Sequence, residues 1–204
     1  MDTGFHDTAE DALSERDASV LQAIEREDLT GFSFDGLKRK LGAHPETLSR
    51  VLDRLEAEGI VQKTLSGYKV TSRGREILKL RPLSKTVSRV RRVLLRTVLP
   101  RDIAIHQIIS ELMGRWFGNL RWIGYSENEK GITLKWITES NGIQVNATFS
   151  QEELRIEGKL QEWNDYGEAV KAAHQLMARI SKLYSGIEKR IVFFRACEHY
   201  PVPA

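Results

Sequence analysis

Apolar side chains recur at helical spacing in the first sixty residues of the chain. The pattern predicts helices over residues 14–28, 34–41 and 45–58, and Gly42 ends the second because glycine adopts left-handed backbone without a Cβ penalty. The third helix opens with a proline, which suits a first helical position. Its buried face follows the i, i+3, i+4, i+7 spacing and consists of Leu48, Val51, Leu52 and Leu55.

A short β-hairpin and a further helix are expected next. Residues 60–64 and 68–71 are expected to form its two strands, which flank a turn at Ser66-Gly67. A helix over residues 72–80 follows, and Pro82 ends it because proline disfavours helical backbone in the residue before it. So short a hairpin is equally suited to touching a ligand and to closing a small sheet.

The segment 83–99 predicts an amphipathic linker helix between two domains. One stripe of the helix is apolar at coiled-coil spacing and the other, about 200° around the helix, is basic. We expect the apolar stripe to pack on a second subunit or on the C-terminal domain. The alternatives are a linker helix whose arginines are only solvated and, in third place, a membrane-surface helix. The apolar stripe is Leu83, Val87, Val90 and Leu94, and the basic stripe is Lys85, Arg89, Arg92 and Arg96.

The C-terminal half predicts an α-β-β-β-β-α arrangement. Helices are expected over residues 102–117 and 168–185, and between them period-two alternation predicts a meander of four antiparallel strands over residues 120–160, with one face buried and one in water. Asn141-Gly142 is a strong hairpin signal. Beyond Gly186 the pattern fits either a continued helix or a fifth strand. The fold class is therefore α+β, with helices covering one face of an antiparallel sheet.

Three tryptophans of this half are candidates for an effector pocket. Trp116, Trp122 and Trp136 could line a space between sheet and helices that binds an apolar or aromatic molecule. Core packing is the favoured interpretation, because small α+β domains fill such space with aromatic side chains.

The N-terminal third resembles the winged helix-turn-helix regulators of the MarR and Lrp type. The resemblance covers roughly residues 14–80, and the C-terminal half resembles no family that we recognise. His44 departs from the pattern, because the family usually has a Ser, Thr or Asp that caps the second helix, and histidine is a poor cap. The matching residues are Leu37, Leu41, Gly42, Pro45, Thr47, Leu48, Ser49, Arg50, Leu52, Leu55, Glu56, Gly59 and Ile60.

This resemblance implies that residues 45–58 enter the DNA major groove. Glu46, Thr47 and Arg50 would then face base edges, with Arg50 suited to a bidentate contact to guanine. The remaining cations would contact phosphates and set the register. The expected phosphate contacts are Lys38, Arg39, Lys40, His44, Arg54, Lys63 and Lys69, together with the basic stripe Lys85, Arg89, Arg92 and Arg96.

The charge distribution supports a nucleic-acid partner. The net charge of +3 divides into −7 over residues 1–28, +11 over residues 29–101 and −1 over the remainder. A basic central third that contains a helix-turn-helix is typical of a nucleic-acid binder, whereas the alternative is a solvated basic face. The acidic residues 1–13 are expected to be a disordered arm.

Catalysis, metals and membranes are all disfavoured by the sequence. The chain has no HExxH motif, no phosphate-binding glycine loop and no G-x-S-x-G turn, so we expect neither an enzyme nor a cofactor. One cysteine permits no disulfide within the chain. The absence of a signal pattern or long apolar run leads us to expect a cytoplasmic protein.

We therefore expect a dimeric, sequence-specific transcriptional regulator that binds double-stranded DNA. The alternatives are an architectural, chromatin-like DNA-binding protein with little sequence preference and a winged helix that binds only protein. A small-molecule effector is left open. The expected segments are 1–13 (acidic arm), 14–81 (winged helix-turn-helix), 82–101 (linker and dimerisation helix), 102–186 (oligomerisation or effector domain) and 187–204 (tail or helix extension).

Overall fold

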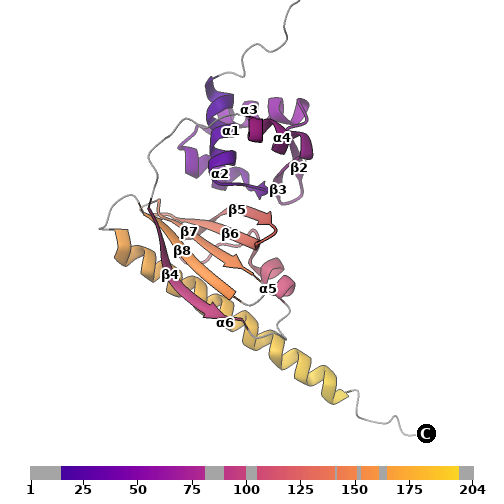
Figure 1. Ribbon diagram of the computed structural model, residues 1–204, viewed down its shortest axis with the longest axis vertical. Coiled ribbons are helices and arrows are strands. Elements are labelled where there is room, and N and C mark those ends of the chain that lie inside the picture. The colour runs from indigo at the N-terminus through magenta and orange to yellow at the C-terminus, as the bar shows by residue number, and fades with distance from the viewer. Residues whose placement is uncertain are drawn as a thin grey trace, which may run out of the picture.

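The fold is mixed, with helices on both sides of an antiparallel sheet (Figure 1). A computed structural model describes residues 15–80, 90–99, 105–140, 142–150, 153–160 and 165–197, without the side chains of residues 15, 16, 80 and 187–197. The predicted arm and the last seven residues lie outside this description. The described elements are α1 (Glu15–Arg26), β1 (Gly31–Phe32), α2 (Phe34–Leu41), α3 (Pro45–Ala57), β2 (Val61–Thr64), β3 (Gly67–Val70), α4 (Ser72–Leu80), β4 (Val90–Val98), α5 (Ile105–Leu112), β5 (Leu120–Asn128), β6 (Gly131–Thr138), β7 (Gln144–Phe149), β8 (Glu153–Leu160) and α6 (Tyr166–Cys197).

The helix boundaries of the N-terminal part follow from capping chemistry. Ser33 caps α2 by accepting a hydrogen bond from the amide of Gly36 at 3.1 Å. Gly42 ends the helix in left-handed backbone at φ 63°, and its amide donates to the carbonyl of Lys38. His44 precedes α3 without a side-chain cap bond, as its residue type predicts. The helix, turn and helix are thus encoded locally.

One sheet runs through both halves of the chain. Its strand order is β2-β3-β1-β5-β6-β7-β8-β4, and every pairing is antiparallel. The two-residue strand β1 pairs with β3 on one side and with β5 on the other, so it joins the predicted wing hairpin to the predicted meander. The four strands of the meander lie where the alternation predicts them.

The predicted linker helix over residues 83–99 is wrong for the part that the structure describes. Residues 90–98 form β4, which pairs with β8 from Val90 opposite Leu160 to Val98 opposite Glu153. The segment is rich in β-branched residues, which favour strands, and the free edge of β8 offers backbone partners that a helix would leave unused. The 3-and-4 spacing of apolar residues was therefore overridden by tertiary pairing.

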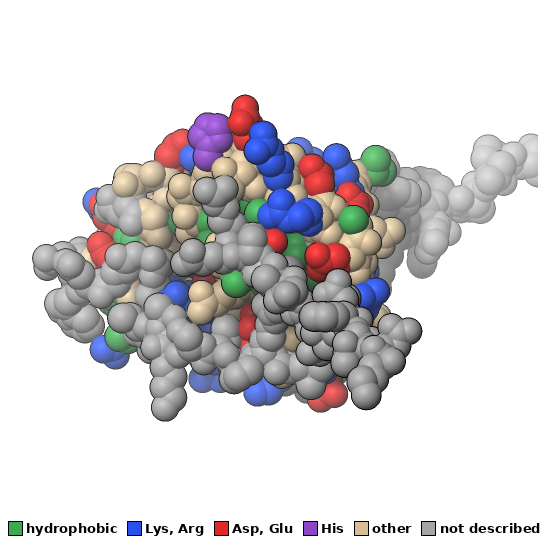
Figure 2. Space-filling view, turned by 90° about the horizontal axis from the view of Figure 1, so that it is seen from above, with side chains coloured by type: hydrophobic (Ala, Val, Ile, Leu, Met, Phe, Trp, Pro, Cys, Tyr) green, Lys and Arg blue, Asp and Glu red, His purple; other side chains and the backbone are tan. Residues whose placement is uncertain are grey.

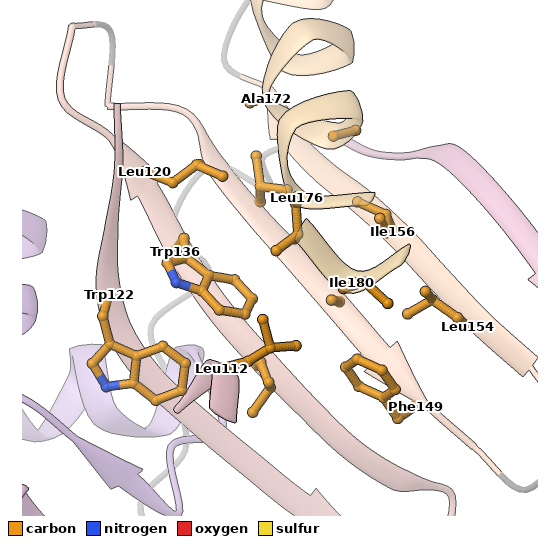
Figure 3. Packing of buried hydrophobic residues seen from close by; sticks show 14 of the residues in the cluster. Leu112, Leu120, Trp122, Trp136, Phe149, Leu154, Ile156, Ala172, Leu176 and Ile180 are labelled. Carbon is orange, nitrogen blue, oxygen red and sulfur yellow. The ribbon is translucent and has the colours of Figure 1, made fainter. Parts of the chain in front are cut away.

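The larger core lies between the sheet and α5 and α6 (Figure 3). Trp136 is fully buried and meets Trp122 edge to face, with 5.2 Å between ring centroids. Leu176 and Ile180 of α6 pack onto the same side of the strands. The helix continues through Gly186 to Cys197, and its last turns extend past the strands (Figure 1).

The helices α1, α2 and α3 and the strands β1, β2 and β3 enclose a second core, which also takes in two side chains of the meander. Ile123 of β5 and Ile137 of β6 are buried in this core. A Cβ added to Gly36 of α2 would lie 2.5 Å from the Cα of Ile123, so only glycine allows α2 to approach β5 so closely. The helix α2 is thus packed directly on the face of the sheet opposite to α5 and α6.

Candidate nucleic-acid interface

The outer face of α3 presents the residues expected to read DNA bases. Glu46 and Arg50 are exposed and Thr47 is half-buried, whereas the apolar face of the same helix is fully enclosed. His44, one residue before the helix, is also exposed. The N-terminal half of α3 is therefore accessible to a partner.

The charge of this surface is balanced rather than basic. Beyond Glu46 and Arg50, α3 exposes Asp53 and Arg54, and its C-cap is Glu58. Arg54 forms an ion pair with the buried Asp17 of α1 at 2.5 Å, and this hydrogen bond raises the pKa of the arginine. Figure 2, which looks onto this end of the molecule, shows Lys, Arg, Asp and Glu side chains intermixed.

The hairpin β2–β3 presents a small polar edge with an apolar tip. Lys63 and Lys69 are exposed, and Leu65 at the turn is completely open to solvent. Tyr68 points inward and stacks on Phe32 at 5.6 Å, and burial raises the pKa of its hydroxyl. The exposed lysines are free to approach a phosphate backbone, and Tyr68 is part of the core.

The three consecutive cations of α2 are each engaged within the protein. Lys38 pairs with Asp35 at 2.9 Å, and Arg39 lies 3.7 Å from Glu139 of the sheet part. Lys40 pairs with Glu27 at 2.9 Å, and only 11% of its side chain is exposed. These expected phosphate contacts therefore already have carboxylate partners, and two of the three link α2 to other parts of the molecule.

A buried polar cluster forms around Glu27 where the N-terminal helices meet the sheet. The carboxylate accepts hydrogen bonds from Lys159 of β8 and, at 2.7 Å, from the side-chain amide of Gln144 of β7. Lys40 reaches the second carboxylate oxygen and also donates to Gln144. Lys135 of β6 donates to the backbone carbonyl of Glu27 at the end of α1. All five residues lie between α1, α2 and the sheet.

Burial and charge act in opposite directions on these groups. Burial would raise the pKa of Glu27, but the charges of Lys40 and Lys159 and its hydrogen bonds lower it to about 2. Burial lowers the pKa of Lys135 to about 8, because Glu27 only partly offsets the loss of hydration. The pKa of Lys159 is lowered by burial in the same way. The lysines and the hydrogen bonds thus favour the ionised form of Glu27 in the folded protein.

Sequence reasoning missed this cluster because its members alternate with the core residues. Lys135, Gln144, Asn146 and Lys159 occupy the strand positions assigned to a solvated face, yet all four are buried. The expectation that this face lies in water is therefore wrong where the N-terminal helices cover it. Nothing in the sequence marks Glu27 as buried, since it stands at the end of an acidic predicted helix and charged helix residues are usually solvated.

The predicted basic stripe is not a stripe of one helix, because its last two members, Arg92 and Arg96, lie on the strand β4. Arg92 and Arg96 are exposed on this strand, and Arg96 pairs with Glu153 at 2.5 Å. Val90 of the apolar stripe is exposed, whereas Leu94 packs against the larger core. The stripe members that lie outside the described residues are Leu83, Lys85, Val87 and Arg89.

The three candidate pocket tryptophans do not share a cavity among the described residues. Trp136 is fully buried, and its indole nitrogen donates to the carbonyl of Arg115 at 2.9 Å. Trp122 borders a hollow of about 190 Å³ that neither of the other two lines. Trp116 is 53% exposed, with the guanidinium groups of Arg39 and Arg121 over its ring at 5.8 and 4.9 Å.

Comparisons with protein-family models, curated proteins and solved structures find no match for this chain. No helix within the described residues is both long and apolar enough to cross a membrane. In that same part of the chain, no group of three or more His, Cys, Asp and Glu side chains is positioned to hold a metal ion.

Proposed function

We propose that this protein is a sequence-specific regulator of transcription that binds double-stranded DNA as a dimer. The observation that carries the proposal is the outward face of α3, where Arg50, Glu46 and Thr47 are accessible at the start of a helix whose other face is buried. A left-handed Gly42 and a short turn hold this helix against α2, and a hairpin follows it. This order of elements suits a helix that enters the major groove.

The contacts that we expect are fewer than the sequence suggested. Arg50 reads a guanine through two parallel hydrogen bonds. His44, Lys63 and Lys69 are exposed and contact phosphates. The cations already held by carboxylates contribute less, because each would have to give up an ion pair before it could bind a phosphate.

We expect the dimer to form through the outer edge of a strand, β4, and no longer through the helix predicted over residues 83–99. β4 is the last strand of the sheet, and its outer edge pairs with no other described strand. Val90, Val93 and Val98 are exposed large hydrophobic residues on it. Open edges with apolar side chains are favoured places for a second chain to add, which is how we expect two copies to associate.

A protein-binding winged helix is the second candidate, and the mixed charge around α3 favours it. The exposed acids of α3 and the internal pairing of the α2 cations remove much of the positive field that DNA attracts. An architectural role loses support, because the basic stripe on which it depended is not a continuous helical rail.

Fluorescence anisotropy separates these functions. The full chain is titrated against random duplexes and against its own upstream DNA over a range of salt concentrations. Regulators of this kind often control themselves, so a specific regulator binds the upstream DNA more tightly at every salt concentration. Equal affinity with equal salt slopes indicates non-specific binding or an operator elsewhere, which selection from the random pool then distinguishes. No binding at low salt indicates the protein-binding alternative.

The Arg50→Ala variant tests the base contact. On the selected site it should lose about 1–3 kcal/mol of binding free energy and relax preference at one base pair. Lys182→Ala, which removes an exposed cation from α6, is the control and should leave the specificity ratio unchanged. If Arg50→Ala weakens selected and random DNA by the same factor, the arginine contacts phosphate and our assignment is wrong.

A further inference from the structure

A polar cavity of about 260 Å³ opens on the sheet beside the Glu27 cluster. Its walls come from the end of α1 and from strands β4, β5, β6, β7 and β8. Five cationic side chains line it, against three carboxylates: Arg91, Lys130, Lys135, Arg155 and Lys159.

The carboxylates around the cavity do not neutralise these cations. Glu27 is shared between Lys159 and Lys40, and Lys40 lies outside the cavity lining. Glu157 lies 4.0 Å from Arg155. Asp28 is the only other acid in the wall.

Three cations therefore lack an anionic partner of their own. Lys135 donates to the backbone carbonyls of Glu27 and Asp28, just after α1, which carry no net charge. Arg91 and Lys130 form no ion pair with any described residue. Arg91 sits opposite Lys159 across the β4–β8 ladder, and its charge lowers the pKa of both Lys159 and Lys135. The cavity thus concentrates positive charge that the protein leaves uncompensated.

Neutral hydrogen-bonding groups complete the wall. The hydroxyls of Thr133 and Thr148 lie 3.0 Å apart on neighbouring strands, and either can turn to donate elsewhere. Ser126 and Asn146 add a hydroxyl and an amide. Lysine, arginine, hydroxyl and amide groups together are the donors that phosphate and carboxylate groups require.

We propose that this cavity binds a small organic anion that carries two or more negative charges, such as a phosphate ester or a polycarboxylate. The volume limits the ligand, because it is below the roughly 300 Å³ at which pockets for drug-sized molecules begin. A bound anion sits against Lys135 and Lys159, the lysines that hold the end of α1 and Glu27. The site therefore lies where a ligand can be sensed by the helix-turn-helix, although its existence does not depend on DNA binding.

Calorimetric titration of the full chain with pyrophosphate and with citrate, at constant ionic strength, tests the proposal. Saturable binding of at least one anion at a single site is expected. The double variant Arg91→Gln, Lys130→Gln should weaken it about tenfold or more, because both side chains lose an uncompensated charge at the site. These side chains are exposed, so the fold should be retained, as thermal unfolding will verify.

The matched control is Lys171→Gln, Lys182→Gln, which removes the same net charge from exposed positions on α6. It should change the affinity less than about twofold, since distant surface charges are screened by salt. Preference for pyrophosphate would identify a phosphorylated ligand, and preference for citrate a carboxylate ligand. Absence of saturable binding for both anions, or equal losses in the two double variants, would overturn the proposal.

Discussion

The two faces of the meander are built from the same strands but are stabilised in different ways. The face toward α5 and α6 buries aromatic and aliphatic side chains, whereas the face toward α1 and α2 buries lysines, amides and one carboxylate beside Ile123 and Ile137. The apolar face gains from every methylene removed from water. The polar face depends on ion pairs and hydrogen bonds, because a buried charge with neither is costly. Truncating a side chain on the apolar face and neutralising a charge on the polar face should therefore lower the free energy of unfolding in different ways.

Truncation of Trp136 should give the largest effect, and it probes the apolar face. Trp136→Ala removes a fully buried side chain together with its hydrogen bond to Arg115, and should lower the free energy of unfolding by about 3–5 kcal/mol. Urea denaturation followed by circular dichroism measures the loss. Trp116→Ala is the control; its ring is half exposed, so it should cost about 1 kcal/mol or less. Equal losses would contradict the assignment of Trp136 to the core.

Glu27→Gln probes the polar face and should produce a loss that depends on pH. The pKa of Glu27 is lowered to about 2 in the folded protein against an ordinary value of 4.5. The ionised carboxylate therefore stabilises the folded protein fully at pH values above 4.5. That contribution, about 3 kcal/mol at pH 7, is lost as pH falls from near 5 towards 2. The variant should be destabilised at pH 7 and approach the wild type near pH 2.

Urea midpoints measured from pH 7 down to pH 2.5 check this difference. Glu46→Gln provides the control, because the carboxylate of Glu46 is exposed on α3 and its loss should cost little stability at pH 7. A wild-type profile that runs parallel to that of Glu27→Gln throughout would show that the lysines around Glu27 do not stabilise its charge.

The sequence predicted the apolar face well because its signal is periodic. Leu134, Trp136, Val145 and Ala147 stand at alternate positions, and alternation alone assigns them to one side of a strand. The turn at Gly42 and the outward face of α3 follow equally from local chemistry. These features depend on neighbours in the sequence, so one chain suffices to predict them.

The polar face and β4 could not be predicted in this way because they depend on distant partners. Gln144 is buried only because Glu27 and Lys40, more than a hundred residues away, lie over it. Residues 90–98 form a strand only because β8 presents a free edge. Accordingly, Lys40 is an expected phosphate contact by sequence but an internal ion-pair partner in the structure.

Arg39→Ala should lower the free energy of unfolding least, because the ion pair that it removes is exposed to solvent. Like Lys40, Arg39 extends from α2 to a partner outside the helix, but its ion pair with Glu139 is 3.7 Å long and both side chains are more than a third exposed. Water screens such a pair, so its loss together with the contact to the Trp116 ring should cost only about 0.5–1 kcal/mol. The cost should also shrink in high salt, because solvent ions screen exposed charges.

Urea denaturation at low and high salt measures both effects, with Lys38→Ala as a control that removes an ion pair within α2 itself. If Arg39→Ala costs as much as Glu27→Gln at pH 7, then the exposed ion pair stabilises the packing of α2 on the sheet as strongly as the buried one, and burial is not what distinguishes the two ion pairs.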